Sequence, residues 1–152
     1  YKGPTALILS RQKLPLLPTT DVPYESGVAR GAYIVKKEKE KPDFTFFASG
    51  SELSLALDVA DELEKLGKDI RVVSMPCMEL FEAQSERYKS SVVDGDIGKR
   101  VSIEAGIEQG WYKYIGREGV AICVEGFGAS APAGALRREL GYNIDAILDR
   151  VL

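Results

Sequence analysis

Residues 43–75 have the sequence DFTFFASGSELSLALDVADELEKLGKDIRVVSM, which predicts a strand, a helix and a second strand in succession. The aromatic run at 43–48 is typical of a buried strand, and 70–74 is rich in β-branched residues. Between them, 51–66 has the length of an ordinary helix. A helix that joins two strands usually crosses over to make them parallel, so this stretch predicts one unit of a parallel sheet.

The helix within this unit shows a helical period and recognisable ends. Leu55, Val59 and Leu63 recur every four residues and form an apolar stripe. Ser51 is expected to cap the first turn, and Gly67 suits the position just after the last turn. The stripe predicts that one face of the helix packs against the sheet.

Three further strands are expected, and the early strand at 31–35 is predicted to lie antiparallel at an edge. The other two are 100–104 and 121–124. Shorter helices are expected at 77–83, 85–91, 111–115, 132–140 and 144–151, and Asn143 is expected to cap the last of them. Strands that alternate with helices predict an α/β fold, here a three-layer αβα sandwich with a mostly parallel sheet of about five strands.

Composition narrows the function. The 152 residues carry a net charge of −3, so no broad basic surface for nucleic acid is expected, and no apolar run is long enough to span a membrane. The chain contains no histidine, which excludes His-based acid–base chemistry by this chain alone. With no histidine and only two thiols, Cys77 and Cys123, a zinc site is not expected, and both cysteines are interpreted as small buried residues in a reducing compartment.

The beginning of the chain differs from the rest. An apolar strand is expected at 5–9, and Ser10-Arg11-Gln12 follows it directly. A guanidinium at the end of a strand suits a phosphate group, although a plain surface arginine has the same pattern. The proline-rich segment 13–29 is interpreted as a linker, and 36–41 as a solvated, mixed-charge loop. A lone strand before a long linker indicates that the chain is a piece of something larger.

Four loops follow parallel strands and are expected to share one edge of the sheet: 49–52, 75–77, 104–106 and 126–130. Glu104 and Glu125 end the last two strands and are candidates for paired acid–base work, although solvated carboxylates have the same spacing. Trp111, Tyr112 and Tyr114 surround Lys113, and this aromatic cluster is interpreted as part of a subunit interface.

Five segments together resemble the transketolase family, and they occur in the family's order. Four of them resemble its C-terminal domain, and the first resembles the strand that closes the preceding, pyrimidine-binding domain. The first is 3–15 (GPTALILSRQKLP), and the others are 48–52 (ASGSE), 71–76 (RVVSMP), 104–114 (EAGIEQGWYKY) and 127–133 (FGASAPA).

The resemblance implies a fragment of a thiamine-diphosphate-dependent transferase, which moves a two-carbon ketol unit between sugar phosphates of the pentose phosphate pathway. Residues 1–27 would end the preceding domain and its linker, and 28–152 would be the C-terminal domain. The cofactor and its Mg or Ca ion would be bound by other domains of a cytoplasmic homodimer, so this chain would be inactive alone. Arg11 would bind the substrate phosphate, and no catalytic, cofactor or metal ligand is expected here.

Two other functions stay open at this stage. A stand-alone module could bind a phosphosugar or a nucleotide at the shared edge of the sheet. A pure interaction protein would bind no ligand and would self-associate through the aromatic cluster.

Overall fold

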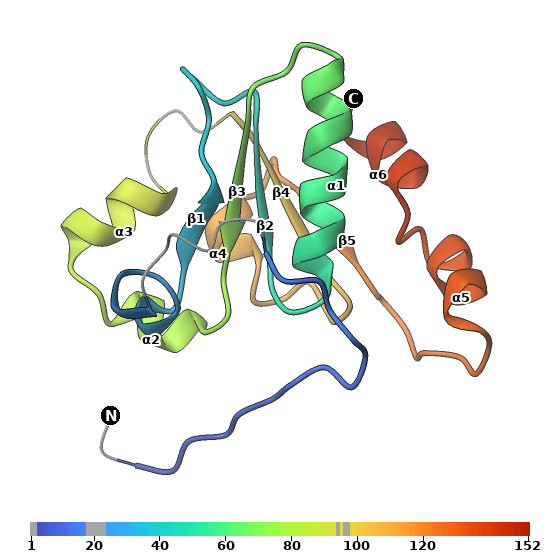
Figure 1. Ribbon diagram of the computed structural model, residues 1–152, viewed down its shortest axis with the longest axis horizontal. Helices are drawn as coiled ribbons and strands as arrows, with labels where there is room; N and C mark the ends of the chain where they lie inside the picture. The colour runs from blue at the N-terminus through green and yellow to red at the C-terminus, as the bar shows by residue number, and fades with distance from the viewer. Residues whose placement is uncertain (1–2, 18–23, 94, 96–97) are drawn as a thin grey trace.

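A computed structural model describes residues 3–17, 24–93, 95 and 98–152 of the chain (Figure 1). Two short 3₁₀ helices, η1 and η2, precede five strands and six α-helices. In chain order the elements are η1 (Tyr24–Ser26), η2 (Val28–Arg30), β1 (Tyr33–Lys36), β2 (Phe44–Ala48), α1 (Glu52–Lys65), β3 (Ile70–Ser74), α2 (Met78–Glu82), α3 (Glu86–Val93), β4 (Lys99–Glu104), α4 (Tyr112–Ile115), β5 (Val120–Cys123), α5 (Ala133–Glu139) and α6 (Ile144–Val151).

The five strands form one sheet in the order β1-β3-β2-β4-β5. Strand β2 lies at the centre, and its Phe46 pairs with Val72 of β3 on one side and Val101 of β4 on the other, both in parallel register. Strand β5 extends the parallel set beside β4, and only β1 runs antiparallel, beside β3 at an edge. The predicted three-layer sandwich with one antiparallel edge strand is therefore confirmed.

Helices cover both faces of the sheet, as Figure 1 shows, and each face has its own core. Alternation along β2 supplies both cores, because Phe46 faces one and Phe47 faces the other, and both are fully buried. The larger core includes Val59 and Leu63 of α1 and Ile147 of α6, and the smaller core is covered by α2, α3 and α4.

Helix α1 buries Val59 and Leu63 of the expected stripe, whereas Leu55 is only partly buried and the expected cap is missing. Its buried residues, which follow the three-to-four spacing, are Leu53, Ala56, Val59, Ala60 and Leu63. The helix ends where Gly67 adopts a φ of 79°, as predicted, and the Lys68 N–H donates to the Leu63 carbonyl. The prediction that Ser51 caps the first turn is wrong, because its hydroxyl donates instead to the Glu52 carboxylate at 2.7 Å. The predicted Asn143 cap is confirmed, since its side chain accepts from the Ala146 N–H at 3.0 Å.

Two expectations about the outer segments need correction. The loop 36–41 is not merely solvated, because Glu38 forms a largely buried ion pair with Arg71. The apolar segment Thr5–Leu9 forms no strand in the described structure, and Ile8 is 92% exposed. A strand requires a neighbour for its backbone hydrogen bonds, and no described strand lies beside this segment.

The opposite edge of the sheet is formed by β5. The N–H of Val124, directly after β5, donates to the carbonyl of Gly106, which follows the neighbouring strand β4. Successive residues of a strand direct their backbone groups to opposite sides, so the Ala121 carbonyl faces the outer edge. There it accepts a hydrogen bond of 2.8 Å from Arg150 of α6.

Candidate functional site

The carboxyl ends of β2, β3 and β4 meet at one edge of the sheet, as the sequence predicts. The Met75 N–H, just after β3, donates to the Ala48 carbonyl of β2 at 2.9 Å. The Ser49 hydroxyl, just after β2, donates to the Glu104 carboxylate of β4 at 2.8 Å. Backbone and side-chain hydrogen bonds thus join loops that are separated by up to 55 residues in the chain.

Glu104 is the most perturbed carboxyl group at this edge. Burial raises its pKa above the usual value, and the neighbouring Glu52 carboxylate raises it further, while the hydrogen bond from Ser49 acts in the opposite direction. Glu125, by contrast, is exposed beyond the end of β5. No contact described in the structure joins the two carboxyl groups, so the edge presents one half-buried carboxyl rather than an acid–base pair.

A cavity of about 380 Å³ lies beside this edge, between the N-terminal tail (residues 3–17) and the rest of the domain. Residues Gln12–Pro15 of the tail form one wall. The other wall is formed by the domain, chiefly by the start of α1, the residue after β5 and the region of α5. Its lining residues are Ser51, Glu52, Ser54, Leu55, Asp58, Ala105, Val124, Leu136, Arg137, Leu140 and Tyr142. Arg11 immediately precedes the tail wall, and its side chain is exposed.

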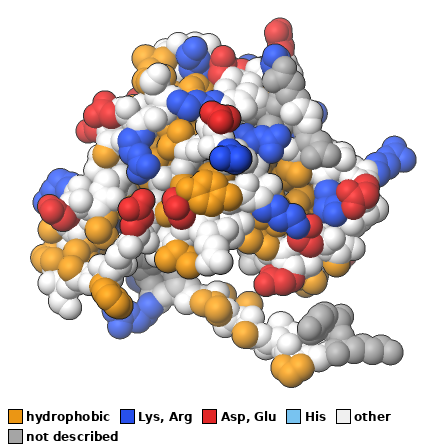
Figure 2. Space-filling model, turned by 180° about the vertical axis from the view of Figure 1, so that it is seen from behind, with side chains coloured by type: hydrophobic (Ala, Val, Ile, Leu, Met, Phe, Trp, Pro, Cys, Tyr) orange, Lys and Arg blue, Asp and Glu red, His pale blue; other side chains and the backbone are white. Residues whose placement is uncertain are grey.

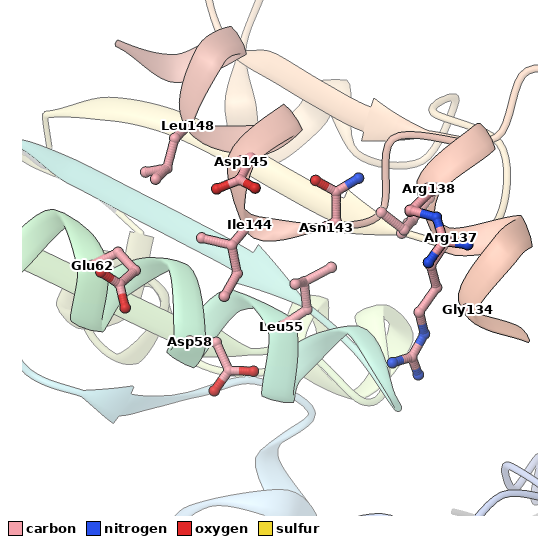
Figure 3. Close-up of a pocket in the computed structure, with 11 residues that line it drawn as sticks. Leu55, Asp58, Glu62, Gly134, Arg137, Arg138, Asn143, Ile144, Asp145 and Leu148 are labelled. Carbon is pink, nitrogen blue, oxygen red and sulfur yellow. The ribbon is translucent and has the colours of Figure 1, made fainter.

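A second, more open cleft of about 550 Å³ lies between α1, α5 and α6 (Figure 3). Asp58 and Glu62 come from α1 and Asp145 from α6, whereas Arg137 and Arg138 come from α5. Sequence reasoning missed this cleft, and the only signal for it is the Arg137-Arg138 pair at the end of a predicted helix. Its mixed charges do not select one ligand class, and it shares Leu55, Asp58, Arg137 and Tyr142 with the smaller cavity.

Tyr142 lines both the cavity and the cleft. It is buried, and its hydroxyl group contacts the carbonyl oxygens of Glu104 and Ile122, to which it can donate one proton. The loop between α5 and α6 is therefore attached directly to β4 and β5. This attachment keeps α5, which has no buried residue of its own, beside the sheet edge.

The aromatic cluster lies on the other face of the sheet and corrects the interface interpretation. Trp111 and Tyr114 are buried within the chain and belong to the smaller core. The Tyr114 hydroxyl donates to Glu82 at 2.8 Å, and Lys113 forms an ion pair with the same carboxylate at 2.7 Å. Of the cluster, only Tyr112 and Lys113 are exposed.

The described residues contain no group of three or more His, Cys, Asp and Glu side chains that is placed to hold a metal ion. Cys77 and Cys123 are free thiols with partial exposure, not fully buried as expected. Within the described ranges, no helix is long and apolar enough to cross a membrane.

The surface carries charges of both signs, and the tail projects from it. Figure 2 shows acidic and basic side chains scattered over one face, with the tail and its hydrophobic side chains extending from the body. Leu7, Ile8 and Leu9 are 80%, 92% and 76% exposed. A segment this apolar is expected to be covered in the assembled protein.

Together the sheet, its two cores and the hollows at its carboxyl edge define a three-layer α/β domain with an apolar N-terminal extension. The chain belongs to the transketolase family, since the model for the transketolase-like C-terminal domain matches residues 31–143. The matched range contains four of the five sequence segments that indicate the resemblance, those from 48–52 to 127–133.

Individual relatives agree with this assignment. The chain is 48% identical over 149 residues to a transketolase of Staphylococcus aureus strain MW2, covering 98% of this chain and 22% of the relative. A solved transketolase from Leishmania mexicana is 38% identical, with a TM-score of 0.75 over 86% of this chain and 18% of that one. A transketolase from Pichia stipitis, solved in complex with sedoheptulose-7-phosphate, is 32% identical, with a TM-score of 0.80 over 92% and 20% of the two chains. The chain thus spans about one fifth of the length of the relatives it matches.

Proposed function

We propose that this chain is the C-terminal part of a thiamine-diphosphate-dependent transketolase, which transfers a two-carbon ketol unit between sugar phosphates of the pentose phosphate pathway. The single observation that carries the proposal is the 48% identity to a transketolase over 98% of the chain. In this proposal residues 1–27 end the preceding domain and form the linker, and 28–152 form the C-terminal domain. The enzyme acts in the cytoplasm.

Thiamine diphosphate and its divalent cation belong, in this proposal, to the other domains. The described residues do not fit such a group, because they offer no set of metal ligands and the chain contains no histidine. No catalytic step is therefore assigned to this chain.

Arg11 is proposed to bind the phosphate group of the sugar substrate. Its side chain is exposed just after the apolar segment Thr5–Leu9, where a neighbouring domain could contact it. A planar guanidinium forms two parallel hydrogen bonds to a phosphate. The complex of the Pichia stipitis relative with sedoheptulose-7-phosphate supports a phosphorylated substrate.

The Arg11 proposal is tested in the complete enzyme with acceptors that carry or lack a phosphate group. Arg11→Ala is expected to raise KM for the phosphorylated acceptor by about tenfold or more, because a charge-assisted hydrogen bond is lost. Arg11→Lys keeps the charge without the fork and is expected to recover only part of the loss. An equal loss with both acceptors would contradict phosphate binding by Arg11.

The remainder of the chain is proposed to support the catalytic domains and a homodimer. Three exposed apolar side chains lie in the loops near the carboxyl edge or in the short helix that follows β4: Ile107, Tyr112 and Phe127, which are 67%, 44% and 103% exposed. Such side chains are typical of surfaces covered by other domains or subunits. Deletion of residues 28–152 from the complete enzyme is expected to abolish the active dimer, and an intact, fully active dimer would refute this role.

The isolated chain provides the complementary test. We expect no ketol transfer from these 152 residues alone, with or without added thiamine diphosphate and Mg²⁺. Ketol transfer would refute the fragment proposal, and micromolar binding of a nucleotide would instead support a stand-alone binding module. The intact mass of the natural gene product is expected to be roughly 4.5 times the 16.6 kDa of this chain, and a product of 16.6 kDa would contradict the proposal.

A further inference from the structure

The exposure of apolar side chains changes along the N-terminal tail. Ile8 and Leu9 are 92% and 76% exposed, whereas Leu14 is 40% exposed. Leu17 packs against the larger core of the domain. Leu16, between them, is 94% exposed. The tail therefore separates into an exposed apolar part and a part that borders the cavity at Leu14 and packs against the domain at Leu17.

Arg11 lies at the junction of these two parts. The segment that follows it, Gln12–Pro15, forms one wall of the cavity of about 380 Å³. The same cavity is lined from the domain side by Leu55 of α1, Leu136 of α5 and Leu140, which directly follows α5. Leu14 is three positions after Arg11 in the sequence, so the backbone of Arg11 lies within about 11 Å of the backbone of Leu14.

We propose that the C-terminal domain positions Arg11 for substrate by seating residues 12–17 against α1 and α5. The positioning residues are Leu14 and Leu17 of the tail, Leu136 of α5, and Leu140 directly after α5. This inference rests on the proposed phosphate-binding role of Arg11, and it gives the C-terminal domain a specific task in substrate recognition. The domain contributes no group to the phosphate itself in this arrangement.

The physical basis is the directionality of the guanidinium group. Its two parallel hydrogen bonds to a phosphate require a fixed plane and distance, so a small displacement of the backbone weakens both at once. Residues 12–17 lead from the preceding domain into the linker, and a linking segment without contacts samples many backbone conformations, so each contact with the C-terminal domain reduces that number. Seating the tail therefore preorganises Arg11 before the substrate arrives.

The test uses the complete enzyme and two leucines at equivalent positions. Leu140 directly follows α5 and lines the cavity, with 41% exposure, whereas Leu66 directly follows α1, is 59% exposed and lines neither the cavity nor the cleft. Leu140→Asp is expected to raise KM for a phosphorylated acceptor by roughly tenfold and to leave kcat within about twofold. The matched control Leu66→Asp is expected to leave both constants unchanged.

Two further measurements separate positioning from general damage. With an acceptor that lacks phosphate, Leu140→Asp is expected to behave as the parent enzyme does. In an Arg11→Ala background, the same substitution is expected to add nothing, because the group that it displaces is already absent. If Leu140→Asp does not fold, Leu14→Asp tests the same contact from the tail side, where the packing of the domain is untouched.

Each outcome is decisive. Unchanged KM in the Leu140→Asp and Leu14→Asp enzymes, together with a raised KM in Arg11→Ala, would overturn the positioning role and keep the phosphate-binding role. Equal losses with both acceptors would also overturn it. No effect of Arg11→Ala itself would instead refute the phosphate-binding role on which this inference rests.

Discussion

At the scale of single residues, Glu104 is the clearest case of a side chain whose ionisation depends on folding. It ends the central run of parallel strands and accepts a hydrogen bond from Ser49. Its pKa is raised, chiefly by burial. A carboxyl group with a raised pKa binds its proton more tightly in the folded state than in the unfolded state. Its contribution to stability is therefore present at low pH and is lost as the pH rises through the folded-state pKa.

This dependence gives a test by substitution. We expect the free energy of unfolding of Glu104→Gln to rise relative to that of the unsubstituted chain as the pH increases from roughly 4 to 8, because glutamine carries no charge into the buried site. Urea denaturation at several pH values measures the difference. Glu118→Gln, at an exposed position, serves as the control. A difference that does not vary with pH would show that the Glu104 carboxyl group has the same pKa in both states.

At the scale of elements, two glycines with similar backbone angles differ in their surroundings. Gly31 ends η2 with a φ of 84°, and a Cβ atom there would lie 2.3 Å from the Cys77 carbonyl oxygen. Gly67 follows α1 with a φ of 79°, and a Cβ atom there would meet nothing within 4 Å. The first glycine permits a close approach of η2 to α2, whereas the second only permits a turn.

Alanine substitutions are expected to separate these two roles. Gly67→Ala is expected to lower the free energy of unfolding by about 1 kcal/mol, which is the cost of a left-handed backbone conformation. Gly31→Ala is expected to cost roughly 3 kcal/mol or more, because the added atom also collides with backbone that cannot move aside. Chemical denaturation of both variants measures the costs. Equal costs would mean that α2 shifts freely away from η2.

The sequence predicts elements well where the signal is local. The stripe of α1, its end at Gly67 and the parallel strands on either side follow from short-range periodicity and turn chemistry. The Ser51 cap fails because the adjacent Glu52 competes for the same hydroxyl group, a contest that propensity rules do not resolve. The cleft between α1 and α5 could not be predicted, since its walls come from segments about 80 residues apart.

At the scale of the whole molecule, the chain combines a domain whose apolar residues pack into two internal cores with a tail whose apolar residues Leu7, Ile8 and Leu9 are exposed. Trp111 and Tyr114 find their partners inside the domain, which is why their composition alone misled the interface interpretation. The tail has the composition of a strand, but its neighbours are not among the described residues. Composition shows that such a segment is to be buried, but not by which surface.

Removal of the tail is therefore expected to change association but not folding. The isolated chain is expected to self-associate through Leu7, Ile8 and Leu9, which are largely exposed. A chain that begins at residue 12 keeps the segment that contacts the domain and is expected to remain monomeric with the same thermal stability. Sedimentation velocity and calorimetry measure the two properties. Equal self-association of both chains would show that another surface mediates it. The exposed Phe127 would then be the first residue to substitute.

The hydrogen bond from Arg150 to the Ala121 carbonyl bears on the aggregation of this polypeptide. An edge strand has unpaired backbone groups that can bind a strand of another chain and so start aggregation. Natural proteins often prevent this with a charged side chain at the edge. Here the charged side chain is Arg150 of α6, which occupies the Ala121 carbonyl on the outer edge of β5. Variants that lack Arg150 are therefore expected to aggregate through this edge more readily than variants that keep it.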